Sequence, residues 1–231
     1  MAKHIGIVGC SAEGAALCYR TICEESGRPM GGYHHPEVTM HTHSFGDYMH
    51  YIDRADWQEV AALMLSSAKK LQRCGARFAI CPDNTIHQAF SLFIDSSPIP
   101  WLHIAEVVVK EAKKHQYKKL AVLGTRYLMD GPVYPEFCRS NRIACAFPSE
   151  VEKQEINRII FSELIFGNFK ESSRHYLNQV IEKLKGEGCD AAVLGCTELP
   201  LIVQPQHCPL PVLDSTRLLA RAAISYALAN E

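Results

Sequence analysis

Short unbroken runs of apolar residues alternate along this chain with longer stretches whose apolar residues recur every three or four positions. The short runs predict strands buried on both faces, and the three-to-four spacing predicts amphipathic helices. The clearest helix spans residues 56–74, where Val60, Met64 and Leu71 share one face and Gly75 ends the pattern. The expected strands cover residues 3–9, 37–42, 77–81, 101–104, 120–124, 143–147 and 191–194. The expected helices cover residues 11–25, 56–74, 105–115, 134–141, 150–166, 170–186 and 214–229, with a short helix from residue 84. This alternation favours an α/β fold with parallel sheets, whose ligands bind at the carboxyl ends of the strands.

The same pattern occurs twice. A-A-V-L-G-C-T-E-L-P at residues 191–200 matches F-A-I-C-P-D-N-T-I-H at residues 78–87, and H-I-G-I-V-G-C-S at 4–11 matches K-L-A-V-L-G-T-R at 119–126. Two pairs of segments at nearly one separation predict two similar parallel-sheet α/β halves. We expect one half to comprise residues 1–100 plus 208–231 and the other residues 101–207. A pseudo-twofold axis would relate them, with the active site in the cleft between them. The last helix is expected to return and pack on the first half.

Cys196 is the centre of the second copy. It ends an apolar strand, and Thr197 and Glu198 are expected in the first turn of a helix. The positive end of a helix dipole favours the thiolate form of a cysteine, and Gly195 would let a ligand approach the backbone. Asp83 holds the matching place in the first copy. If the halves face each other, Asp83 and Cys196 approach one site from opposite sides.

Composition narrows the class of partner. The chain has 231 residues, of which 47% are hydrophobic, and a formal net charge of −1. Its basic residues form no block that would bind nucleic acid, and no apolar run approaches the ~20 residues of a spanning helix. We therefore expect no nucleic-acid or membrane partner. The ten cysteines are scattered, mostly in apolar segments, and no export signal opens the sequence, which favours free thiols and a cytoplasmic location.

Two cofactor patterns are incomplete. Gly6, Gly9 and Gly14 miss the G-x-G-x-x-G spacing of a dinucleotide loop, so a tight turn that offers N–H groups to a carboxylate is the better interpretation. His41 and His43 lie on one strand face, but no third ligand completes a metal site, so we expect no metal there. Residues His34, His35 and His50 complete this group of histidines, which we interpret as structural.

At this point the motifs resemble a known family. G-C-T-E at 195–198, N-T-x-H at 84–87 and G-x-x-G at 6–9 are similar to motifs of the cofactor-independent aspartate/glutamate racemase superfamily, and closest to its aspartate/glutamate racemase branch. Further similar segments at 102–104, 123–127 and 156–161 extend the resemblance over nearly the whole chain. Two-base members carry a cysteine at both junctions, whereas Asp83 occupies the first junction here. Cys81 stands two residues earlier, on the same strand face if the strand continues.

The resemblance implies chemistry at the α-carbon of an amino acid. Such a racemase uses no pyridoxal phosphate, and it needs a base on one face, an acid on the other and hydrogen-bond donors around the substrate carboxylate. Cys196 is the candidate for one face and Asp83 for the other. Asp83 has an alternative role as the cap of the helix that follows it. The candidate donors are Cys10, Ser11, Asn84, Thr85, Thr125, Thr197 and Glu198. We also expect a homodimer that binds a small carboxylate or amino acid.

Two other functions stay open on the sequence. A lyase, decarboxylase or cis–trans isomerase of the same superfamily would use Cys196 alone. A protein without catalytic activity would clamp a small carboxylate between its two lobes. Loss of CO₂, a moved double bond or an inverted centre separates these possibilities.

Overall fold

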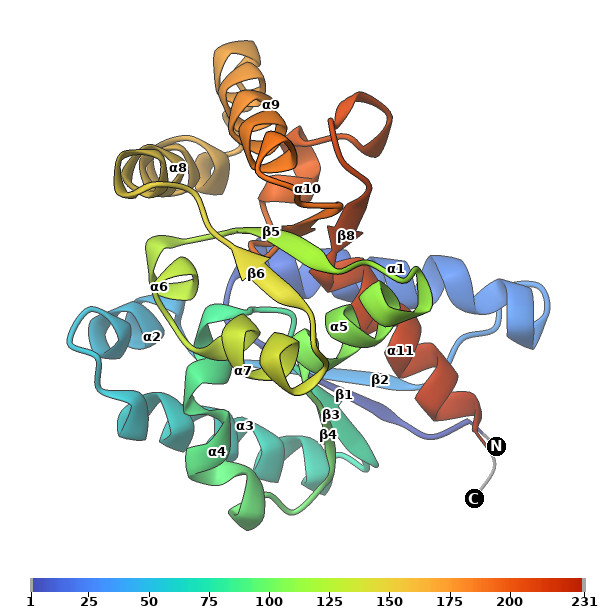
Figure 1. Cartoon of the computed structure of the whole chain (residues 1–231). Helices are drawn as coiled ribbons and strands as arrows, with labels where there is room; N and C mark the ends of the chain where they lie inside the picture. Colours follow the sequence, from blue (N-terminus) through green and yellow to red (C-terminus); the bar gives the residue numbers. More distant parts are fainter. Residues whose placement is uncertain (1, 230–231) are drawn as a thin grey trace. The chain divides into compact units, whose positions relative to one another are not determined.

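The computed structural model describes residues 2–229 and divides into two compact units. Unit 1 comprises Met1–Val107 and Thr216–Glu231, and unit 2 comprises Val108–Ser215. Each unit contains one four-stranded sheet in which all strands are parallel (Figure 1). The α/β fold class with two parallel sheets is therefore confirmed.

The two sheets share one strand order. Unit 1 has the order β2-β1-β3-β4, and unit 2 has the order β6-β5-β7-β8. The strands of unit 1 are β1 (Ile5–Gly9), β2 (Val38–Thr42), β3 (Phe78–Ile80) and β4 (Trp101–Leu102). The strands of unit 2 are β5 (Lys119–Leu123), β6 (Ala144–Ala146), β7 (Ala191–Leu194) and β8 (Val212–Asp214). The internal repeat in the sequence therefore corresponds to equivalent strands, β1 with β5 and β3 with β7.

Helices cover both faces of the unit 1 sheet, so its central strands are apolar throughout. The helices α1 (Ala12–Met30), α5 (Ile104–Lys114) and α11 (Ser215–Leu228) contribute side chains to the core of one face. The helix α3 (Trp57–Arg73) packs against β1, β2 and β3. Asp56 begins α3 by accepting a 3.3 Å hydrogen bond from the Glu59 N–H, and Gly75 follows its end at φ 94°.

The last helix packs on the first unit, as predicted. Leu219 and Ala223 of α11 join the core formed by β1, β3 and α1 (Figure 1). Tyr226 packs on Phe78, with 4.6 Å between ring centroids, and Arg221 forms an ion pair of 2.7 Å with Glu25 of α1. The end of the chain thereby completes the unit that its beginning starts.

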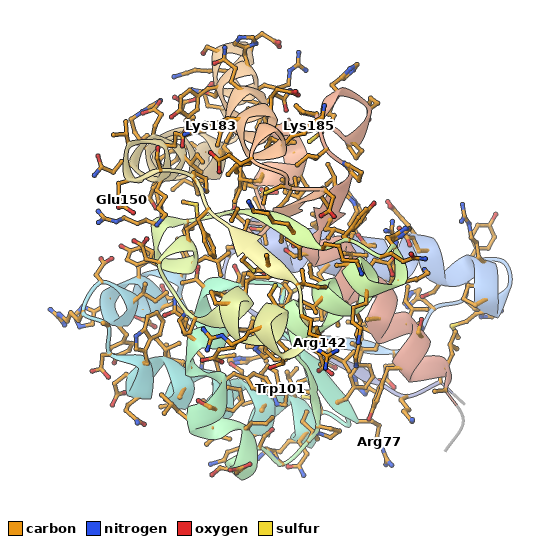
Figure 2. The ribbon with its side chains drawn as sticks, viewed as in Figure 1. Arg77, Trp101, Arg142, Glu150, Lys183 and Lys185 are labelled. Carbon is orange, nitrogen blue, oxygen red and sulfur yellow. The ribbon has the colours of Figure 1, made fainter. Side chains whose placement is uncertain are left out.

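The helices of unit 2 are α6 (Arg126–Met129), α7 (Val133–Ser140), α8 (Glu150–Ser162), α9 (Glu171–Gly186) and α10 (Leu199–Ile202). Apolar residues of α8 and α9 form one core with β5 and β7. A capping box between Ser149 and Glu152 begins α8, and Glu152 also pairs with Lys183 of α9, which is labelled in Figure 2. The two helices are thus held to the same face of the sheet.

The structure corrects several predicted elements. A helix that the sequence analysis missed, α2 (Phe45–Ile52), follows the histidine-rich strand. The helix α1 runs past Gly27 and Pro29 to Met30 and ends at Gly31, which has φ 84°. The expected crossover at 205–211 is followed by β8, which was also missed. The segment after Asp83 is a 3₁₀-helix (Thr85–Ala89), then α4 (Phe90–Phe93) and a second 3₁₀-helix (Ile94–Ser96).

A further correction concerns Thr197 and Glu198. They lie in a turn, and the helix that follows them, α10, has only four residues. The expected helix dipole at Cys196 is therefore that of a single helical turn, which is weak. Separately, no helix among residues 2–229 is long and apolar enough to cross a membrane.

Candidate active site

In each unit, the turns that carry the expected site residues follow the two adjacent central strands of the sheet. In the order β2-β1-β3-β4, β2 lies on one side of β1, and β3 and β4 lie on the other. The strand order therefore reverses between β1 and β3, and parallel sheets bind ligands at such a switch point. The pairing of β1 with β3 ends at Ile7 and Ile80, and beyond it the Cys10 N–H lies 3.2 Å from the Asp83 carboxylate. Arg77 directly precedes β3, at the amino ends of the strands, and Figure 2 shows its side chain pointing away from the sheet.

Unit 2 repeats this arrangement. The pairing of β5 with β7 ends at Leu123 and Leu194, and Thr125 and Cys196 each follow two residues later. The expected site residues therefore gather in two groups, one at the carboxyl edge of each sheet. Unit 1 holds Cys10, Ser11, Asp83, Asn84 and Thr85, and unit 2 holds Thr125, Cys196, Thr197 and Glu198.

In unit 1 the Asp83 carboxylate is held by the backbone at the start of α1. Its Oδ2 accepts a hydrogen bond of 3.2 Å from the Cys10 N–H, and its Oδ1 accepts one of 3.2 Å from the Ser11 N–H. Both bonds favour the anionic carboxylate. No side-chain cap hydrogen bond begins the 3₁₀-helix at Thr85. Two of the N–H groups expected to bind a substrate carboxylate therefore bind a carboxylate of the protein itself.

Cys81 lies deeper than Asp83, as the spacing on the strand suggested. Its side chain is fully buried, and its Sγ donates a long hydrogen bond of 3.9 Å to the Asp83 carbonyl. Burial and the negative charge of Asp83 raise the pKa of the Cys81 thiol well above its usual range. Cys81 is therefore a protonated structural thiol at neutral pH.

Tyr48 of α2 lies beside this group, and the sequence analysis missed it because α2 was not expected. Its side chain is fully buried, with its hydroxyl beside the side chain of Ser67 in α3. Burial, followed by the nearby charges of Cys81, Cys10 and Asp83, raises the pKa of the phenol. The three-to-four spacing of Phe45, Tyr48, Met49 and Ile52 was the signal for an amphipathic helix here.

His87 closes the N-T-x-H segment inside the core. Its Nε2 donates a 3.0 Å hydrogen bond to the Cys81 carbonyl, and its ring lies edge-on to that of His103, 4.5 Å between centroids. Burial lowers the pKa of His87 to about 4 and that of His103 to about 2. Both rings are therefore neutral near pH 7, and His87 acts as a support for the strand end that carries Asp83.

In unit 2 the thiol of Cys196 is paired with a buried carboxyl group. Cys196 Sγ donates a hydrogen bond of 2.9 Å to Glu198 Oε2, and the Thr197 hydroxyl donates one of 2.8 Å to the same oxygen. The relative exposures of Cys196 and Glu198 are only 8% and 4%. The structure thus places a proton acceptor directly against the candidate thiol.

The glycines beside Cys196 are required by packing. A Cβ at Gly195 would lie 2.4 Å from Leu128 Cδ2 and 3.0 Å from the Leu123 carbonyl oxygen, and one at Gly124 would lie 2.7 Å from the same Leu128 atom. The Gly195 N–H donates a 2.7 Å hydrogen bond to that Leu123 carbonyl. The expectation that Gly195 leaves space for a ligand is corrected, because Leu128 and the end of β5 fill that space.

Two more side chains support the unit 2 turn. Thr125 begins α6 by accepting a 3.3 Å hydrogen bond from the Leu128 N–H. Ser215, just after β8, donates a 2.8 Å hydrogen bond to the Leu194 carbonyl at the end of β7. The sequence analysis missed Ser215 because β8 has only three residues, too few for a periodic signal.

The histidine-rich segment is held by protein contacts. His41 pairs through Nδ1 with the Ser67 hydroxyl at 3.0 Å and accepts a 3.0 Å hydrogen bond from Lys70 at Nε2. Burial and the charge of Lys70 lower the pKa of His41 and of His43. Within residues 2–229, no group of three or more His, Cys, Asp or Glu side chains is arranged to hold a metal ion.

Two repeated parallel sheets, each with ionisable side chains at the carboxyl ends of its central strands, define a class of two-unit α/β enzymes. Comparisons with known proteins specify the class. The sequence profile described as Asp/Glu/hydantoin racemase matches residues 6–223. The chain belongs to this family, and it is accordingly an isomerase of the racemase class. The resemblance inferred from the motifs is confirmed.

Individual relatives agree. The chain is 26% identical over 182 residues to the broad specificity amino-acid racemase RacX of Bacillus subtilis (strain 168), covering 78% of each sequence. It is similar to the crystal structure of a candidate Asp/Glu racemase from Yersinia pestis, with a TM-score of 0.90, 31% identity, and coverage of 98% of this chain and 100% of that one. An aspartate racemase homologue from Pyrococcus horikoshii OT3 gives a TM-score of 0.86 and 30% identity over 99% and 100% of the two chains.

Proposed function

We propose that this protein interconverts the enantiomers of a small amino acid by removing and returning the proton at the α-carbon with its own side chains. The observation on which this proposal rests is the hydrogen bond from Cys196 to Glu198 at the switch point of unit 2. The thiol there can exchange a proton with a substrate, and the adjacent carboxylate gives the thiol proton an acceptor.

The substrate class follows from the family and from the named relatives. RacX is named a broad specificity amino-acid racemase, and the Pyrococcus protein is named an aspartate racemase homologue. We propose that the present chain binds an amino acid with its carboxylate among the N–H and hydroxyl donors of the two strand-end turns. Asn84, Thr85, Thr125 and Thr197 are the proposed side-chain donors, together with the side chains of Cys10 and Ser11, whose backbone N–H groups bind Asp83.

Racemisation needs proton transfer on both faces of the α-carbon. We propose that Cys196 serves one face and that the unit 1 turn containing Asp83 serves the other. What supports this arrangement is the equivalence of the strands β3 and β7, which carry Asp83 and Cys196. Assembly as a homodimer in the cytoplasm also belongs to the proposal, and sedimentation of the purified protein measures the assembly.

The test is hydrogen exchange at the α-carbon. Each amino acid, as its separate L and D enantiomers, is incubated with the protein in deuterated water, and α-deuteration and chirality are followed together. The proposal expects deuterium incorporation with inversion for at least one amino acid. Binding without exchange contradicts it, and so does release of CO₂ without inversion.

A further inference from the structure

Unit 2 contains a pair of cysteines outside the candidate active site. Cys138 lies in α7 and Cys145 in β6, and both are free thiols. A short turn joins the two elements, and a 2.9 Å hydrogen bond from the Ile143 N–H to the Cys138 carbonyl closes it. The two side chains meet across this turn, where the Cys145 thiol donates a hydrogen bond to the Cys138 sulfur.

We propose that Cys138 and Cys145 are an oxidation site, at which a hydroperoxide converts the two thiols into a disulfide, and that this disulfide slows turnover at Cys196. The effect on turnover rests on the proposed racemase function, whereas formation of the disulfide does not. All the residues involved belong to unit 2.

The first reason is the position of the two sulfur atoms. A disulfide has a specific geometry with an S–S bond of about 2.05 Å, so it forms only between cysteines whose side chains face each other. The hydrogen bond between Cys138 and Cys145 meets this condition. Cys145 is partly exposed on the edge strand β6, whereas Cys138 is only 1% exposed. A small oxidant therefore reaches the pair beside Cys145.

The second reason is the ionisation of the pair. The hydrogen bond from Cys145 lowers the pKa of Cys138, and the same bond, together with burial, raises the pKa of Cys145. A thiolate is the form of cysteine that attacks a peroxide, and oxidation-sensitive cysteines often lie next to a second cysteine that completes the disulfide. Cys138 and Cys145 supply these two roles in one hydrogen-bonded pair.

The third reason is that Tyr134 connects this pair to the turn that carries Cys196. Tyr134 lies four residues before Cys138 in α7, so both side chains project from the same face of the helix, and both are buried. A Cβ at Gly195 would lie only 3.6 Å from Tyr134 Cε2, so the ring packs against the residue before Cys196. Because protein interiors are close-packed, a movement of α7 is passed to this turn.

The hydroxyl of Tyr134 makes a second connection. It bonds with the hydroxyl of Ser215, which itself donates a 2.8 Å hydrogen bond to the Leu194 carbonyl at the end of β7. Because the single proton of the serine hydroxyl is used in that bond, Tyr134 is the donor to Ser215. Leu194 lies two residues before Cys196, so Tyr134 is a positioning residue for the strand end that carries the thiol.

The oxidation step balances. The Cys138 thiolate attacks one oxygen of the hydroperoxide, the O–O bond breaks, and the leaving oxygen takes up a proton. The resulting sulfenic acid reacts with the Cys145 thiol, so that the S–S bond forms, the S–O bond breaks and water leaves. Two thiols are thereby oxidised by two electrons while one hydroperoxide is reduced. The shorter sulfur–sulfur distance draws α7 toward β6 and displaces Tyr134 from the Cys196 turn.

The first experiment detects the disulfide without any substrate. The reduced protein is treated with hydrogen peroxide, free thiols are blocked with iodoacetamide, and the non-reduced peptides are mapped by mass spectrometry. We expect a disulfide between Cys138 and Cys145 that dithiothreitol reverses. Cys189→Ser is the matched control, because Cys189 is a further buried cysteine close to Cys145, and this variant should form the same disulfide. A disulfide between Cys145 and Cys189, or none, contradicts the inference.

The second experiment separates the cysteine pair from direct oxidation of Cys196. Peroxide should slow α-deuteration by the wild type by about 10- to 100-fold, reversibly with dithiothreitol, because the thiol is displaced from its reactive position. Cys145→Ser cannot form the disulfide, so it should match the reduced wild type and keep its turnover after the same treatment. If it loses turnover as fast as the wild type, peroxide acts on Cys196 itself and the inference is wrong. Cys138→Ala gives the same comparison if Cys145→Ser folds poorly.

Failure of the inference and failure of the function give different results. If the disulfide forms and wild-type exchange is unchanged, its control of turnover is wrong while the racemase function stands. If the reduced protein exchanges no amino acid, the proposed function fails, and the rate of iodoacetamide labelling of Cys196 still tests the connection. Labelling should be slower in the peroxide-treated wild type than in Cys145→Ser treated in the same way, and equal rates overturn the connection.

Discussion

Cys196 and Glu198 share a hydrogen bond of 2.9 Å, in which the thiol donates to a carboxylate oxygen that also accepts from Thr197. All three side chains are buried, so solvent competes little for these bonds. The thiol proton of Cys196 therefore has one fixed acceptor, the Glu198 carboxylate. A flexible surface cysteine would have no such partner.

Replacing Cys196 with serine tests the thiol. Serine keeps the approximate size but is a far weaker acid, so we expect turnover to fall by at least about 100-fold. Chiral chromatography measures the turnover, and far-UV circular dichroism with a thermal melt serves as the folding control. Wild-type turnover in this variant would overturn the assignment of Cys196.

Glu198→Gln removes the charge but keeps an oxygen that accepts from the thiol. We expect kcat to fall by about 10- to 100-fold, because the amide cannot take up the thiol proton. Glu163→Gln is the matched control, since Glu163 is a second buried carboxylate of unit 2, paired with Ser173 and Arg158. We expect that control to lose stability and to keep kcat. Equal losses of kcat in both variants contradict a specific role for Glu198.

His87 predicts a pH dependence of stability. Its pKa is about 4 in the folded protein and about 6.5 when exposed, so between these values the unfolded chain binds more protons. Stability is therefore lost as the pH falls from about 6.5 to about 4, and the gap corresponds to roughly 3 kcal/mol. His87→Gln keeps a donor for the Cys81 carbonyl without titrating. Urea unfolding of this variant should show a shallower decline over that pH range, and an unchanged slope would contradict the assignment.

Gly195→Ala tests the packing of the Cys196 turn. Its Cβ would lie 2.4 Å from Leu128 Cδ2, so we expect a loss of about 1–3 kcal/mol in the free energy of unfolding. Gly186→Ala is the control, because no atom lies within 4 Å of the new Cβ. That change in α9 should stabilise the protein by about 0.5–1 kcal/mol. Equal effects of both substitutions would contradict the packing argument.

Long periodic segments were predictable from the sequence. The helix α3 was predicted within one residue at each end, because Asp56 and Gly75 mark its limits and its apolar face is regular. The last helix was also predicted, with its packing on unit 1. Short elements were not. The three-residue strand β8 is too brief for a periodic pattern, and the eight-residue helix α2 shows its apolar spacing over only two turns.

The sequence by itself determined the two repeated α/β sheets, the family, and the strand-end positions of Asp83 and Cys196, because these are written in local periodicity and in short motifs. Only the tertiary structure decided which groups meet there. Parallel pairing of β1 with β3 brings Cys10 and Ser11 to the Asp83 carboxylate across more than seventy intervening residues, as the 73-residue separation of Cys10 and Asp83 shows. The turn after β7 closes Cys196 onto Glu198. Such contacts depend on strand register and on side-chain direction in the folded chain, and neither is encoded by the identity of a single residue.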